Sequence, residues 1–224
     1  MITHKTHSEN KQKSTVSPFI FMLLIKCASI FKVSFIVGSY LAFFSATAII
    51  SPLAGAFMSI ANVCLVFAFG LTAKVIIAGA LPSFKFLAYI IPGFFASLYW
   101  SSPSALIRVL VPLACMAAFI AHPAIGAGWV YSLYWFIPVA LYFSRKQTVF
   151  LQSLGSTFTA HAVGSVIWLY ALPMTPAVWL GLIPVAFVER MIFATGMVIA
   201  YHVINYAVQS SRQVSLVAFK KHLA

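Results

Sequence analysis

A succession of long apolar segments, separated by short connectors rich in Pro and Gly, is the feature that most constrains this chain. The segments lie at residues 33–50, 55–78, 84–100, 105–121, 127–143, 150–170 and 177–206. Most come close to the length of about 20 residues at which an α-helix crosses a bilayer. A soluble domain has about 25% charged residues, whereas 7% of this chain is charged and 62% is hydrophobic. The sequence therefore predicts an all-α fold, a polytopic integral membrane helix bundle with the lipid bilayer as its solvent.

The polar ends of the chain divide it into four predicted parts. Residues 1–17 are a polar N-terminal tail, and residues 18–32 are an interfacial segment, because the apolar run there is too short to span a bilayer. Residues 33–208 form the transmembrane helical domain. Residues 209–224 form a basic C-terminal tail.

The distribution of positive charge predicts the topology. The net charge is +12, from 14 Lys and Arg against 2 acidic residues, and the cations gather at both ends and in the connector 144–148. Cytoplasmic loops are enriched in Lys and Arg, so we expect a multi-pass protein of the cell membrane with both termini in the cytoplasm. An even number of crossings follows, about six, with seven or eight left open. The stretch from Pro82 to Pro112 is the main candidate for a segment that does not span.

The segment 150–170 carries hydroxyl groups and an imidazole within an apolar stretch. At about 100° per residue on a helix, Thr157, His161, Gly164 and Trp168 share one face. Small residues occupy the opposite side, which favours close helix packing. We therefore expect a helix enclosed by protein, with its polar stripe facing a partner helix or a cavity. For His161, a hydrogen bond to a neighbouring helix and a role in ligand binding or proton transfer are both open.

Glu189 and Arg190 lie near the middle of the last apolar segment, and Glu9 is the other acidic residue of the chain. Ionisable groups at membrane depth are costly and point to a functional site. Neighbours in sequence point about 100° apart on a helix, so these two side chains need not pair with each other. A structural ion pair that fixes helix packing is the alternative. In a solute site, Arg190 would favour an anionic group.

Two pairs of small residues spaced by four indicate close helix contacts: Ala42 with Ala46, and Gly196 with Ala200. The first pair and the hairpin HAVGSVIWLYALPMTPAVWLGLIPVAFVER, residues 161–190, resemble the substrate-binding S components of energy-coupling-factor vitamin transporters. The resemblance implies a small helical membrane protein that binds a solute. It also implies energy-coupling membrane and ATPase subunits as partners, with Ala42 and Ala46 as candidate coupling contacts.

Several chemistries are excluded or disfavoured by what the sequence lacks. It contains no GxSxG, HExxH or P-loop motif and no Asp, which excludes sites built on paired aspartates. His122, His161 and His202 lie on different segments with no i,i+4 pairing, so a metal site has little support. No basic and aromatic groove pattern indicates nucleic acid. Cys27, Cys64 and Cys115 are set apart in apolar runs and are predicted to be buried free thiols. We expect no catalytic residue, metal or cofactor.

Three functions follow, in descending order. The first is a transport or substrate-binding membrane component without its own ATPase, which binds an unidentified small solute, uncharged or weakly anionic. Its predicted site residues are Thr157, His161, Trp168, Glu189 and Arg190. The second is a structural or assembly membrane protein, in which the polar groups only join helices. The third, an intramembrane enzyme, is disfavoured because no acidic residue is evident to orient a Ser–His pair.

Overall fold

The computed structural model of the chain describes residues 16–35, 43–81, 84–144 and 146–223. The elements in chain order are α1 (Pro18–Ala28), β1 (Lys32–Phe35), β2 (Phe43–Ser45), α2 (Thr47–Ile50), the 3-10 turn η1 (Ser51–Leu53), α3 (Ala54–Phe57), α4 (Ile60–Ala78), α5 (Phe84–Ser101), the π-helical turn η2 (Leu106–Leu110), α6 (Val111–Ile120), the 3-10 helix η3 (Gly126–Trp135), α7 (Phe136–Tyr142), α8 (Val149–Ala171) and α9 (Pro176–Leu223). The predicted all-α class is confirmed, with one short β-hairpin as an addition.

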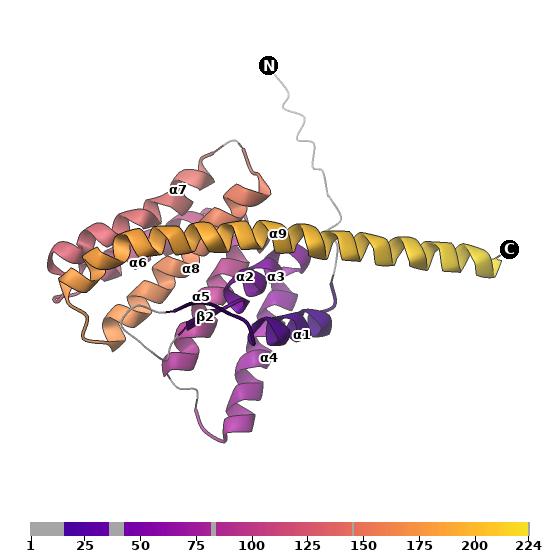
Figure 1. Cartoon of the computed structure of the whole chain (residues 1–224), viewed down its shortest axis with the longest axis horizontal. Coiled ribbons are helices and arrows are strands. Elements are labelled where there is room, and N and C mark those ends of the chain that lie inside the picture. The colour runs from indigo at the N-terminus through magenta and orange to yellow at the C-terminus, as the bar shows by residue number, and fades with distance from the viewer. Residues whose placement is uncertain (1–15, 36–42, 82–83, 145, 224) are drawn as a thin grey trace, which may run out of the picture.

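Helix α8 is the centre of the bundle, packed against α5 on one side and α9 on another (Figure 1). Its small residues allow the close approach to α5. A side chain at Gly155 would run into the ring of Tyr99, and Thr159 and Ala162 on the same side of α8 are fully buried. The Ser156 hydroxyl donates a 2.9 Å hydrogen bond to the Ala96 carbonyl. The small-residue side of α8 is therefore enclosed by protein.

Two hydrophobic clusters flank this centre. The first joins α1, the α2–α4 region and the middle of α9, and it includes the fully buried Leu53 and Met197. The second joins α6, η3, α8 and the first part of α9, where the ring of Phe119 meets the rings of Trp135 and Trp179 edge to face at 5.0 and 4.9 Å. Helix α9 contributes residues to both clusters and so connects them.

The prediction of one continuous helix over residues 33–50 is wrong at residues 33–35 and 43–45, which are strands, while residues 47–50 form the short helix α2. Residues 32–35 and 43–45 form an antiparallel hairpin in which Lys32 faces Ser45 and Phe35 faces Phe43. Val and Phe favour extended backbone, and strand pairing satisfies the backbone groups that a helix would otherwise satisfy internally. The chain then enters α2, η1 and α3 as a series of short helical turns.

Helix α9 is longer than expected. It runs without a break through Pro184 and continues to Leu223, so the predicted tail 209–224 is helical over its described residues. No Gly or Pro follows Gly196 in the chain, and these are the residues that most disfavour a helix interior. In Figure 1 the C-terminal part of α9 projects well beyond the rest of the bundle.

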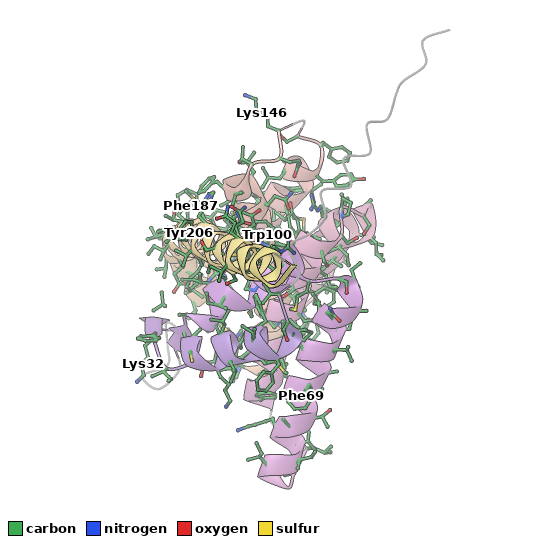
Figure 2. All side chains as sticks on the ribbon, turned by 90° about the vertical axis from the view of Figure 1, so that its right-hand side faces the viewer. Lys32, Phe69, Trp100, Lys146, Phe187 and Tyr206 are labelled. Carbon is green, nitrogen blue, oxygen red and sulfur yellow. The ribbon has the colours of Figure 1, made fainter. Side chains whose placement is uncertain are left out.

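Within the described part of the chain, two helices are long and apolar enough to cross a membrane. These are α4, with mean hydropathy 2.2, and Pro176–Val214 of α9, with mean hydropathy 1.8. Helix α4 exposes large apolar side chains such as Phe69, 60% exposed, and Figure 2 shows Phe69 on α4 at the opposite end of the molecule from Lys146. These helices suggest association with a membrane.

The cysteines are more exposed than the sequence predicts. Cys27 and Cys64 are exposed and Cys115 is half-buried; all three are free thiols. The prediction of burial is therefore wrong for Cys27 and Cys64. An apolar run shows that a residue avoids water, but it does not show whether that residue faces the protein interior or the outside of an apolar helix.

Candidate functional site

A partly enclosed cavity of about 600 Å³ lies between α8, the first half of α9, α5, η3 and the segment from Ser45 to Pro52. The five predicted solute-binding residues all line it: Thr157, His161, Trp168, Glu189 and Arg190. Gly164, the remaining member of the predicted stripe, lines it too. The polar face of α8 is therefore directed at a cavity.

The α8–α9 hairpin determines which residues meet in this cavity. Helix α8 ends at Ala171 and α9 begins at Pro176, so residues equally distant from the turn lie level with one another. Glu189 and Arg190 are thereby level with the stretch from Thr157 to His161, while Trp168 lies nearer the turn. At about 1.5 Å per residue, Thr157 and Trp168 are about 16 Å apart along α8. The cavity thus has a polar end and an aromatic end.

The polar end contains an ion pair between sequence neighbours. Arg190 Nη2 and Glu189 Oε2 are 3.5 Å apart, so these two side chains of α9 contact each other although they are neighbours on one helix. Arg190 is buried, 5% exposed, and its guanidinium lies 4.7 Å from the centre of the Phe193 ring. Ring contact and ion pairing together offset part of the cost of burying this cation.

The imidazole of His161 lies at the same end. Its ring centre is 5.1 Å from that of Tyr131 and 6.2 Å from that of Phe158. Its Nε2 atom is buried, and no described residue forms a hydrogen bond with it. A buried polar atom without a partner costs free energy unless a bound molecule or water satisfies it. The hydrogen bond to a neighbouring helix, one of the two roles open for His161, is therefore absent at this nitrogen.

Three aromatic rings form the other end. The Trp168 ring meets the Phe84 ring edge to face, with centres 5.6 Å apart, and the Tyr89 ring at 6.5 Å. All three residues line the cavity. Such edge-to-face contacts hold the rings in defined orientations, so this end offers an ordered apolar wall to a planar group.

One wall of the cavity was missed by the sequence reasoning. Ser45 at the end of β2, Thr47 in α2 and Ser51 in η1 line the cavity. The Ser45 and Thr47 hydroxyl oxygens are 2.6 Å apart. The available signal was the hydroxyl-rich stretch SATAIIS, residues 45–51. It was hidden by the expectation of a continuous span over these residues.

The predicted packing residues fall into two groups. On α9, a Cβ at Gly196 would lie 2.7 Å from Ile49 Cδ1 of α2, and Ala200 packs against the first hydrophobic cluster. This face of α9 therefore makes close internal contacts. Ala46 follows β2 and donates its backbone N–H to the Phe31 carbonyl at 2.8 Å, while Ala42 lies outside the described residues. A coupling contact through either alanine stays a prediction.

The described residues contain no group of three or more His, Cys, Asp or Glu side chains able to hold a metal ion. Comparisons of the chain with known protein families, curated proteins and solved structures found no match. The cavity and the residues that line it are therefore the features of this chain that bear on its function.

Proposed function

We propose that this chain is a multi-pass membrane protein that binds a small solute in the cavity beside α8 and takes part in its transport. The observation that carries the proposal is the convergence of Thr157, His161, Trp168, Glu189 and Arg190 on one cavity. Sites for small molecules commonly enclose about 300–1,000 Å³ and combine apolar walls with a few polar groups. The volume of about 600 Å³ and the mixed lining fit that description.

The arrangement favours binding over a purely structural role. Polar groups that join helices pair across the helix interface, as Ser156 does with the Ala96 carbonyl. His161 instead lines a cavity and leaves its buried Nε2 without a partner among the described residues. Energy for transport would come from partner subunits, because the sequence has no P-loop. This division of labour is the one implied by the resemblance to S components.

The proposal includes a membrane crossing by α8, which is less apolar than the two candidate spans α4 and α9 and would cross while enclosed by α5 and α9. Its 23 residues extend about 34 Å, enough for a hydrocarbon core of about 30 Å. The basic connector before α8 would face the cytoplasm, and the turn between α8 and α9 would face the other side.

Cysteine labelling tests this orientation. In a background with Cys27, Cys64 and Cys115 replaced by alanine, Ser144→Cys and Thr175→Cys place single thiols at the two ends of α8. We expect a membrane-impermeant maleimide to label Ser144→Cys in inside-out vesicles and Thr175→Cys in right-side-out vesicles, because α8 separates them by the thickness of the bilayer. Labelling of both positions from the same side would contradict the crossing.

Filling the cavity tests the binding function. Ala160 lines the cavity on α8, so a phenylalanine there would occupy solute space. We expect small molecules that co-purify with the native protein, identified by untargeted mass spectrometry after denaturation, to fall at least about tenfold in Ala160→Phe, the loss that about 1.4 kcal/mol of binding energy produces.

The matched control makes the same substitution at Ala207, which is exposed on α9 away from the cavity. Ala207→Phe should retain the full amount of co-purifying solute. Both variants must elute as a single symmetrical peak in gel filtration, so that misfolding is separated from loss of the site. Equal amounts of solute in the two variants, or none with the native protein, would reject the proposed function.

A further inference from the structure

The ion pair at the polar end makes the permanent charge of the cavity zero. Among the described residues that line it, Glu189 and Arg190 are the ones with permanent charge. Their charges are opposite, and Arg190 Nη2 and Glu189 Oε2 are 3.5 Å apart. Arg190 is 5% exposed, so solvent screens this pair far less than it would screen an ion pair at a protein surface. A bound solute therefore meets a balanced pair of charges.

The opposite charges of Glu189 and Arg190 affect which solutes can bind in the cavity. A charged solute would lose its hydration on entry and would add a charge that the cavity does not compensate. A neutral group with an adjacent carbonyl and N–H avoids that cost. Its oxygen can accept a hydrogen bond from a guanidinium, and its N–H can donate one to a carboxylate. The partnerless Nε2 of His161 lies at the same end of the cavity.

The aromatic end adds a second requirement. The Trp168 ring meets the Phe84 and Tyr89 rings edge to face, and the described residues that line this end include no charged one. Planar apolar groups bury area against such rings and gain favourable ring contacts. His161 and Trp168 are about 10 Å apart along α8, so an elongated solute can reach both ends of the cavity, whereas a single-ring amide meets one end at a time.

We propose that the cavity selects net-neutral aromatic solutes that carry an amide-like polar group, and that the Glu189–Arg190 pair is what rejects their charged analogues. The inference rests on the proposed function and specifies its substrate class. It replaces the expectation that Arg190 favours an anionic group, because the carboxylate of Glu189 already balances that cation.

Three probes of nearly equal size test the charge preference: benzamide is neutral, benzoate is an anion and benzylammonium is a cation. Binding is measured by saturation-transfer NMR on the full chain in lipid nanodiscs at neutral pH. We expect benzamide to bind the native protein at least about tenfold more tightly than either charged probe, as expected for uncompensated burial of a charge. Equal or tighter binding of benzoate or benzylammonium would overturn the proposal, as would the failure of all three probes to bind.

Variants of Glu189 and Arg190 test whether this ion pair causes the rejection of charged solutes. Glu189→Gln leaves the cavity with a net positive charge, so benzoate should become the preferred probe. Arg190→Gln leaves a net negative charge, so benzylammonium should become preferred. The double variant Glu189→Gln/Arg190→Gln is neutral again and should return the preference to benzamide. A pair with only a structural role would change stability and leave the order of the three probes unchanged, which would refute the inference.

The experiments separate a failure of folding from a wrong substrate class and from the absence of solute binding. If the single variants do not fold, Ala160→Asp adds a carboxylate to the cavity beside the intact pair, and benzylammonium should then become the preferred probe; an unchanged order in this variant would refute the inference. If the charge preference fails while Ala160→Phe still removes the co-purifying solute, the binding function holds and the substrate class is wrong. If Ala160→Phe and Ala207→Phe retain equal amounts of solute, the proposed function itself fails.

Discussion

Replacing Gly55 by alanine is expected to destabilise the protein more than the same substitution at any other glycine that the structure describes. A Cβ at this position would collide with the Ser97 carbonyl oxygen and would lie 2.9 Å from the Ser101 nitrogen. These are backbone atoms of α5, so α3 and α5 would have to separate. Overpacking a core costs about 1–3 kcal/mol, and we expect about 3 kcal/mol or more here. The measurement is the temperature at which detergent-solubilised protein loses its gel-filtration peak.

Gly181→Ala is the matched control. Gly181 lies inside α9, and a Cβ there would meet no heavy atom within 4 Å. Alanine is a better helix former than glycine by about 1 kcal/mol, so this variant should melt at the native temperature or above it. A Gly55→Ala variant as stable as Gly181→Ala would show that α3 and α5 are not in close contact.

The second large effect is expected from Arg108→Met. The buried guanidinium of Arg108 donates to the Tyr99 carbonyl at 2.9 Å, to the Ser102 carbonyl at 3.1 Å and to Gln152 Oε1 at 3.2 Å. Tyr99 lies in the last turn of α5 and Ser102 directly follows that helix, at the end where backbone acceptors lack helical partners and the helix dipole is negative. Hydrogen bonds to charged groups contribute about 1.5–3 kcal/mol each, so we expect a loss of about 3 kcal/mol, measured by the same thermal assay.

Two further variants identify the cause of that loss. Arg108→Lys keeps the positive charge but loses the planar fork that reaches three partners at once, so its melting temperature should fall between the native value and that of Arg108→Met. Arg212→Met removes an exposed cation near the end of α9 and should leave the melting temperature unchanged. Equal melting temperatures for Arg108→Met and Arg212→Met would contradict the role of the guanidinium in joining α5 to α8.

The functional face of α8 was the part of the site most accessible from sequence. Thr157, His161 and Trp168 recur at helical spacing, and that spacing places them on one face wherever the helix lies. The small residues on the other side similarly indicated burial, and Gly155 indeed packs against Tyr99. These predictions succeeded because helical periodicity is a property of neighbouring residues alone.

Other features could not be predicted from helical periodicity. The hairpin of β1 and β2 depends on pairing between residues 32–35 and 43–45, and the apolar composition of that segment suits a helix or a strand. The contacts of Arg108 could not be predicted, because its partner Gln152 lies on another helix. The 3.5 Å contact between Glu189 and Arg190 depends on side-chain rotamers, which sequence spacing does not specify.

The sequence by itself determined that the chain is helical and apolar, and which residues share each face of α8, because composition and helical spacing are local properties. Only the tertiary structure decided that the polar stripe faces a cavity, that Ser45 and Thr47 line it from the other side, and that Glu189 neutralises Arg190 within it. The reason is physical: a cavity is space left between segments far apart in the chain, and its charge depends on which side chains the packing brings together.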